Sequence, residues 1–177
     1  MRAIVLPFVP AWVKPNMLTV LRFMLTPAVL LLIQTQHWDF ALPLFLFTAF
    51  TDALDGSLAR LRHQITAWGT FYDPVADKML IGSISLLVVA KYVSPWFAFL
   101  MLGMEVMIVL GGAWGRRRGH IISSNIFGKC KMLFQVIGIT LLIFAVWKNN
   151  LMLYPWAVGV LVVSLVLAAI SFFTYGL

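Results

Sequence analysis

Residues 152–174 read MLYPWAVGVLVVSLVLAAISFFT and contain no charged side chain. A helix needs about 20 predominantly apolar residues to cross the hydrocarbon core of a bilayer, and this run is long enough. Five more apolar runs of similar length precede it, at about 17–36, 40–62, 69–91, 96–115 and 125–146. The sequence therefore predicts an all-α fold, an integral membrane bundle of six transmembrane helices.

The whole chain of 177 residues shares this apolar character. Hydrophobic residues make up 62% of the chain and charged residues 11%, with a mean hydropathy of +0.98. Soluble domains have about 45–50% apolar and about 25% charged residues. This composition excludes a disordered chain and a cytosolic domain, and the single Cys130 excludes a disulfide scaffold. Because the breaks between the apolar runs are short, residues 17–177 are predicted to form one transmembrane domain.

The first 16 residues, MRAIVLPFVPAWVKPN, have a basic start and an apolar stretch, as a signal peptide does. Three prolines interrupt the stretch, and no small-residue cleavage site follows it. We therefore expect residues 1–16 to form a short interfacial segment with Trp12 and Lys14 at the level of the lipid headgroups.

The distribution of basic residues predicts the orientation. The chain has 13 Lys and Arg against 6 Asp and Glu, a net charge of +7, but no basic stripe lies outside the apolar runs, so nucleic acid is not an expected partner. Lys and Arg mark the cytoplasmic face of membrane proteins. With the N-terminus inside, only Lys91 and Lys148 lie outside, so both termini are predicted to be cytoplasmic. The basic residues on the cytoplasmic side are then Arg2, Lys14, Arg22, Arg60, Arg62, Lys78, Arg116, Arg117, Arg118, Lys129 and Lys131.

Four of the six acidic residues, Asp52, Asp55, Asp73 and Asp77, lie in the second and third predicted spans. A carboxylate inside a span costs about 2.5–3.5 kcal/mol on insertion scales. At 100° per residue, Asp52 and Asp55 are about 60° apart around the helix axis, and Asp73 and Asp77 are about 40° apart. Each pair therefore lies on one face of its helix. The spans are antiparallel neighbours through the loop 63–68, so the carboxylates are expected to converge just inside the cytoplasmic surface. Oxygen ligands suit Mg²⁺ or Mn²⁺, and we expect two cations per site.

The residues around these acids suit a phosphate group. Gly56 and Ala59 let a ligand approach the backbone closely, Arg60 can pair with a phosphate in a bidentate manner, and Thr66 offers a hydroxyl. Taken singly, small residues in a span more often mark helix packing, and an arginine more often marks topology. An ion or proton transporter is the competing interpretation of intramembrane acids, but it leaves Gly56, Ala59, Arg60 and Gly69 unexplained.

The combined spacing is Asp-x2-Asp-Gly-x2-Ala-Arg-x8-Gly-x3-Asp-x3-Asp. It resembles the signature of the CDP-alcohol phosphotransferase family (CDP-alcohol phosphatidyltransferase class-I) at all eight fixed positions, for which chance agreement anywhere in the chain is on the order of 10⁻⁸. The eight positions are Asp52, Asp55, Gly56, Ala59, Arg60, Gly69, Asp73 and Asp77.

This resemblance implies a reaction and a set of roles. Members of the family displace CMP from a CDP-linked lipid when the hydroxyl of an alcohol attacks the β-phosphorus, and they typically form homodimers. By resemblance, the four aspartates bind the metal ions, and Asp77 is also the general base, although geometry alone does not separate it from Asp73. The residues that match contacts to the CDP moiety are Pro15, Asn16, Met17, Leu18, Gly56, Arg60 and Thr66.

The acceptor alcohol is inferred from further resemblances. The run DPVADK at 73–78 resembles phosphatidylglycerophosphate synthases and the related cardiolipin synthases, which implies CDP-diacylglycerol as donor and a bacterial cytoplasmic (inner) membrane location. Arg116, Lys129 and Lys131 are candidates to hold the phosphate of glycerol 3-phosphate. The synthases usually carry Arg-Glu where this chain has Met104-Glu105, and often threonine where it has Met132. A cardiolipin synthase, or an enzyme with a different acceptor, is therefore the alternative.

Overall fold

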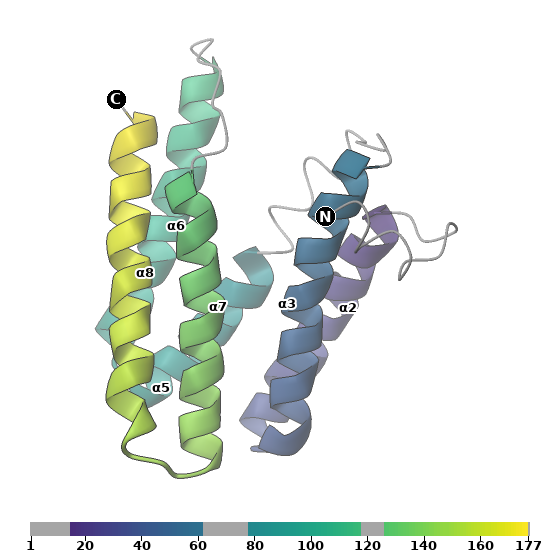
Figure 1. Cartoon of the computed structure of the whole chain (residues 1–177), viewed down its shortest axis with the longest axis vertical. Coiled ribbons are helices and arrows are strands. Elements are labelled where there is room, and N and C mark those ends of the chain that lie inside the picture. Colours follow the sequence, from purple (N-terminus) through teal and green to yellow (C-terminus); the bar gives the residue numbers. More distant parts are fainter. Residues whose placement is uncertain (1–14, 62–77, 118–125, 177) are drawn as a thin grey trace. The chain divides into compact units, whose positions relative to one another are not determined.

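The structure is a computed structural model that describes residues 15–61, 78–117 and 126–176. In the helix ends 15–16, 52–61, 112–117 and 175–176 it describes the backbone alone. All regular secondary structure in the described residues is helical, which confirms the all-α fold (Figure 1). The chain divides into two compact units, residues 1–80 and 81–177, and each is described by itself.

The first unit is built on a helical hairpin. Helices α2 (Pro15–Gln34) and α3 (Trp38–Leu61) pack side by side and run antiparallel (Figure 1). Proline suits the first position of α2, where a helix has no partner for the backbone N–H. The turn between the helices begins with Gln36 at φ 60°, and the N–H of His37 donates to the carbonyl of Leu32 at 2.9 Å. This left-handed C-cap ends α2 cleanly and reverses the chain.

The buried side chains of this hairpin change in character along its length. Val29, Ile33, Ala41 and Phe45, near the turn, are buried and apolar. Toward the other end the buried residues are polar, namely Thr19, Arg22, Thr26, Thr48 and Thr51. Several of the threonine hydroxyls donate to carbonyls of their own helix at 2.6–2.8 Å, which satisfies them without water.

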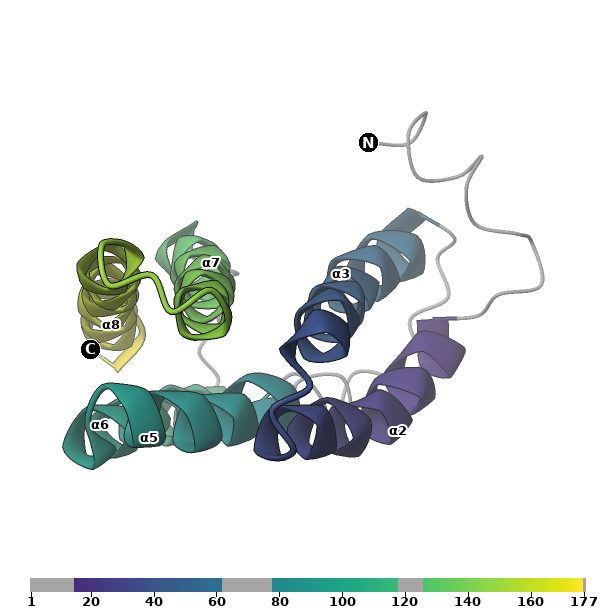
Figure 2. The same cartoon turned by 90° about the horizontal axis from the view of Figure 1, so that it is seen from below.

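The second unit begins within the third predicted span. Residues 78–84 are α-helical and continue into the π-helical turn η2 (Ser85–Val89) and the short α5 (Ala90–Tyr92). Helices α6 (Pro95–Arg117), α7 (Ile126–Trp147) and α8 (Leu153–Gly176) follow. Figures 1 and 2 both show α7 and α8 side by side as an antiparallel pair. Their turn repeats the first one, with Asn149 at φ 48° and the N–H of Asn150 donating to the carbonyl of Ala145 at 2.9 Å.

Helices α7 and α8 approach each other closely at Gly138. A Cβ atom there would lie 2.6 Å from Cδ2 and 2.8 Å from Cγ of Leu161, and 3.3 Å from its backbone nitrogen. Leu161 is fully buried, so its side chain has no room to move away. Small residues at such crossings let helix backbones pack closely inside a bilayer.

We expect Gly138→Ala to destabilise the protein by about 1–3 kcal/mol, because overpacking a tight contact forces side chains or helices apart. The thermal midpoint in detergent should fall by roughly 2–4 °C for each kcal/mol. Gly159→Ala, on the partner helix, is the matched control because nothing lies within 4 Å of its added Cβ. Equal midpoints for the two variants would contradict this account of the crossing.

The lengths and surfaces of the helices fit a bilayer. Three stretches are long and apolar enough to cross it, namely Met17–Gln34, Ile126–Trp147 and Leu153–Thr174, and Trp38–Thr51 and Pro95–Gly111 are shorter apolar stretches. Large apolar side chains such as Met24, Phe99 and Phe173 are exposed, as a lipid-facing surface requires. The predicted membrane bundle is therefore supported, while the number of six spans stays a prediction.

The predicted boundaries are close to the helices observed. Helix α2 begins at Pro15, two residues before the predicted start of the first span at about 17, because proline suits the first position of a helix. The third predicted span is described only from residue 78 onward, and its π-helical turn has no counterpart in the sequence prediction. Residues 1–14 lie outside the described residues.

Candidate active site

Half of the acidic motif lies on a helix whose geometry is described. Helix α3 is continuous to Leu61, so Asp52, Asp55, Gly56 and Arg60 all occupy its last turns. The premise of the sequence argument is thereby confirmed for this half: a spacing of three on an α-helix puts Asp52 and Asp55 on one face. A common face is what the predicted metal site requires of these two positions.

The predicted entry to the nucleotide site is at the same end of the hairpin. Residues 15–18 form the first turn of α2, and because α3 runs back antiparallel, that turn and the last turns of α3 share one end (Figure 1). Met17 is exposed and Leu18 half-buried. The hairpin thus brings together two groups of residues that are more than 30 positions apart in the sequence.

The remaining members of the motif lie outside the described residues. Thr66, Asp73 and Asp77 fall between the end of α3 and the described helix that begins at Lys78. Within the described ranges there is no group of three or more His, Cys, Asp or Glu side chains suited to a metal ion. Since two of the four predicted ligands fall outside those ranges, the metal site stays a prediction.

Arg22 has a different environment from the one that the sequence suggested. It was counted among the cytoplasmic topology charges, but its side chain is fully buried and has an interaction partner. It follows Thr19 by three positions and precedes Thr26 by four, so all three lie on one face of α2. This polar stripe at helical spacing was the sequence signal that could have indicated a buried Arg22.

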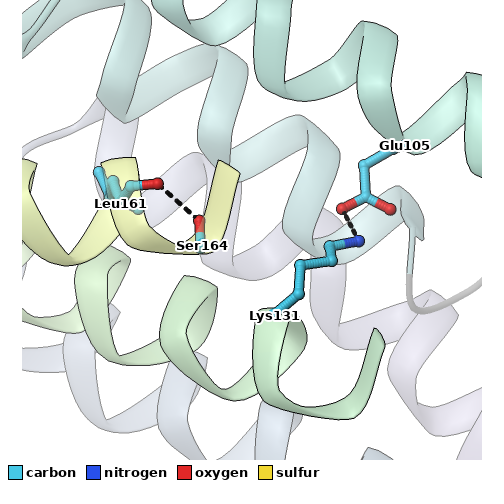
Figure 3. Close-up of polar contacts among 4 residues, drawn as sticks. All are labelled: Glu105, Lys131, Leu161 and Ser164. Atoms are coloured by element: carbon cyan, nitrogen blue, oxygen red, sulfur yellow. Dashed lines mark hydrogen bonds and ion pairs between the residues drawn. The ribbon is translucent and has the colours of Figure 1, made fainter. Parts of the chain in front are cut away.

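The candidate acceptor residues lie in the second unit. Arg116 is in the last turn of α6, Lys129 is exposed in the first turn of α7, and Lys131 is partly buried. The Nζ atom of Lys131 forms an ion pair with Oε1 of Glu105 on α6, and each side chain is only 11% exposed (Figure 3). The sequence singled out both residues but did not predict that they pair. On α8, the hydroxyl of Ser164 donates to the carbonyl of Leu161 at 2.7 Å (Figure 3).

Comparison with known proteins identifies the family. A family model described as CDP-alcohol phosphatidyltransferase matches residues 12–172. The chain belongs to this family. The match includes the complete motif from Asp52 to Asp77 and also Glu105 and Lys131, so the resemblance inferred from eight positions extends over nearly the whole chain. The protein is therefore a phosphatidyltransferase of the membrane.

Several curated relatives share most of their length with this chain. A CDP-diacylglycerol–glycerol-3-phosphate 3-phosphatidyltransferase of Escherichia coli (strain K12) is 33% identical over 171 residues, 91% of each chain. A protein of the same name from Wigglesworthia glossinidia brevipalpis is 28% identical over 169 residues, again 91% of each. A third, from Aquifex aeolicus, is 32% identical over 128 residues, 71% of this chain and 72% of its own.

Proposed function

We propose that this protein transfers the phosphatidyl group of CDP-diacylglycerol to glycerol 3-phosphate, releasing CMP and forming phosphatidylglycerophosphate. The observation that carries the proposal is the complete eight-position motif within a family match over residues 12–172. Relatives named for this reaction, with 91% of both chains aligned, support glycerol 3-phosphate as the acceptor.

The four aspartates Asp52, Asp55, Asp73 and Asp77 are the proposed ligands of two Mg²⁺ or Mn²⁺ ions. The helical geometry of α3 supports this role, because it gives Asp52 and Asp55 a common face, and carboxylate oxygens are the ligands these hard cations prefer. Bound there, the cations would neutralise the pyrophosphate and the charge that develops on the departing CMP.

The residues of this chain then have distinct tasks. The CDP moiety is held by Gly56, Arg60 and Thr66 together with the first turn of α2, residues 15–18. Asp77 accepts the proton of the glycerol hydroxyl. The hydroxyl oxygen forms a bond to the β-phosphorus, the bond from that phosphorus to the bridging oxygen breaks, and the electron pair leaves with CMP.

The phosphate of the acceptor is assigned to the basic residues of the second unit, Arg116, Lys129 and Lys131. Arginine binds phosphate through a planar fork, and lysine binds it as a compact charge with three N–H donors. The ion pair with Glu105 uses part of the hydrogen-bonding capacity of Lys131 and leaves two of its donors for a ligand.

We propose that the active enzyme spans a bacterial inner membrane six times, with both termini in the cytoplasm, and forms a homodimer. The excess of basic residues on the predicted cytoplasmic side supports this orientation. The two lysines assigned to the outer side each lie beside an aromatic ring. The Nζ atom of Lys148 is 3.7 Å from the ring centroid of Trp147, and that of Lys91 is 5.1 Å from the ring centroid of Tyr92. Such pairs are suited to the membrane–water interface, where aromatic side chains concentrate.

An acceptor panel tests the proposal. Purified protein in detergent with CDP-diacylglycerol and Mg²⁺ or Mn²⁺ is expected to release CMP with glycerol 3-phosphate, and not with serine, inositol phosphate or phosphatidylglycerol. Release of CMP only with phosphatidylglycerol would instead identify a cardiolipin synthase. Activity only with serine or inositol phosphate would refute the proposed acceptor, while leaving the family assignment intact.

A further inference from the structure

Glu105 is an intramembrane acid that the aspartate motif does not use. It lies on α6 within the apolar stretch Pro95–Gly111. Ala98, Met101 and Glu105 share one helix face and are buried, whereas Phe99, Leu100, Val106 and Met107 are exposed. The carboxylate therefore faces the interior of the second unit, where an uncompensated charge would be costly.

Its partner compensates that charge. Lys131 reaches Glu105 from the second turn of α7, and both side chains are almost nine-tenths buried (Figure 3). A lysine side chain has four rotatable carbon–carbon bonds and no preferred direction of its own. The contact with Oε1 of Glu105 directs its ammonium toward α6, and two N–H donors remain for another acceptor.

Lys129 is placed quite differently. It precedes Lys131 by two positions, which on an α-helix is about 200° around the axis. Its exposure agrees with this, since Lys129 is exposed while Lys131 is mostly buried. The two lysines therefore point in nearly opposite directions, and only Lys131 has its position defined by a carboxylate.

We propose that Glu105 is a positioning residue for the acceptor site: it holds the ammonium of Lys131 so that its remaining donors bind the phosphate of the acceptor. This inference rests on the proposed function, because it requires a phosphorylated acceptor. It concerns ground-state binding of that acceptor alone. A buried lysine without its carboxylate is an unpaired charge, and its flexible stem is free to carry the ammonium elsewhere.

Removing the charge of Glu105 should weaken the binding of glycerol 3-phosphate and leave the binding of CDP-diacylglycerol unchanged. Glu105→Gln keeps the shape of the side chain and removes its charge. We expect the KM for glycerol 3-phosphate to rise about 10- to 100-fold, the range that corresponds to the loss of one charge-assisted hydrogen bond. The KM for CDP-diacylglycerol and the kcat at saturating acceptor should stay within about threefold of wild type. Glu105→Asp retains the charge and should recover a large part of the acceptor affinity.

Two further variants keep the test independent of folding. Lys131→Met should raise the acceptor KM at least as much as Glu105→Gln does, and the double variant, which has no unpaired charge, should show no further increase over Lys131→Met. Asp39→Asn removes an exposed acid at the start of α3 and should leave all constants unchanged.

Equal increases in both KM values, or an acceptor KM within twofold of wild type in both Glu105→Gln and the double variant, would overturn the inference. Neither result would affect the proposed reaction, which depends on whether the wild-type protein releases CMP with glycerol 3-phosphate. An unchanged acceptor KM in the double variant would remove only Lys131 from the proposed phosphate site.

Discussion

Replacing Asp77 with asparagine is expected to lower the rate of CMP release by about 10²–10⁴-fold, the usual cost of removing a general base. Asparagine has nearly the same shape as aspartate but cannot accept the proton of the glycerol hydroxyl. Binding of the CDP moiety should persist, because the residues assigned to it, including Gly56 and Arg60, are untouched. The measurements are single-turnover CMP release and equilibrium binding of CDP-diacylglycerol.

Asp39→Asn is the matched control for this variant. It makes the same chemical change at an exposed acid in the first turn of α3, at the opposite end of the helix from the motif. We expect wild-type kinetics from it. A rate above about 10% of wild type for Asp77→Asn would exclude Asp77 as the general base. The role would then pass to Asp73, because the helical spacing does not distinguish between the two residues.

Removing divalent cations is expected to abolish CMP release completely. Four carboxylates close together would repel one another without a cation, and Arg60 is the only basic residue among the eight motif positions. Dialysis against a chelator should reduce the rate to background, and adding Mg²⁺ or Mn²⁺ should restore it. Full activity in excess chelator would refute the metal assignment.

A titration of the cation separates the roles of individual ligands. Asp52→Asn and Asp55→Asn should each raise the concentration of Mg²⁺ or Mn²⁺ needed for half-maximal rate, because each removes one charged oxygen ligand. Asp39→Asn is again the control and should leave that concentration unchanged. Unaltered cation dependence in both α3 variants would show that this face of the helix does not bind metal.

Much of the fold could be predicted because bilayer length and helical periodicity are local properties of the sequence. The run at 152–174 and helix α8 (Leu153–Gly176) differ by only one or two residues at each end. Both hairpin turns lie where the apolar runs are interrupted, at Gln36 and Asn149. Helix α2 begins at Pro15, two residues before the predicted first span, because proline suits the first position of a helix.

The pairing of Glu105 with Lys131 could not be predicted, because the two residues are 26 positions apart on different helices. Their contact depends on how α6 and α7 are rotated about their axes, which is decided by packing. Arg22 illustrates the same limit: its burial depends on tertiary contacts, although the spacing of Thr19 and Thr26 indicated a polar face. The motif itself was predictable because all eight of its positions lie within one stretch, 52–77.

The π-helical turn Ser85–Val89 gives the third predicted span a tolerance to a change in chain length that a regular α-helix lacks. A π-helical turn is an α-helix that has accommodated one additional residue. Deleting one residue there would let a regular α-helix form, with residues 78–84 keeping nearly the same orientation relative to α5. The same deletion within a regular α-helix would turn the preceding residues by about 100°. We therefore expect this helix to tolerate the loss of one residue at η2 better than the loss of one from its regular turns.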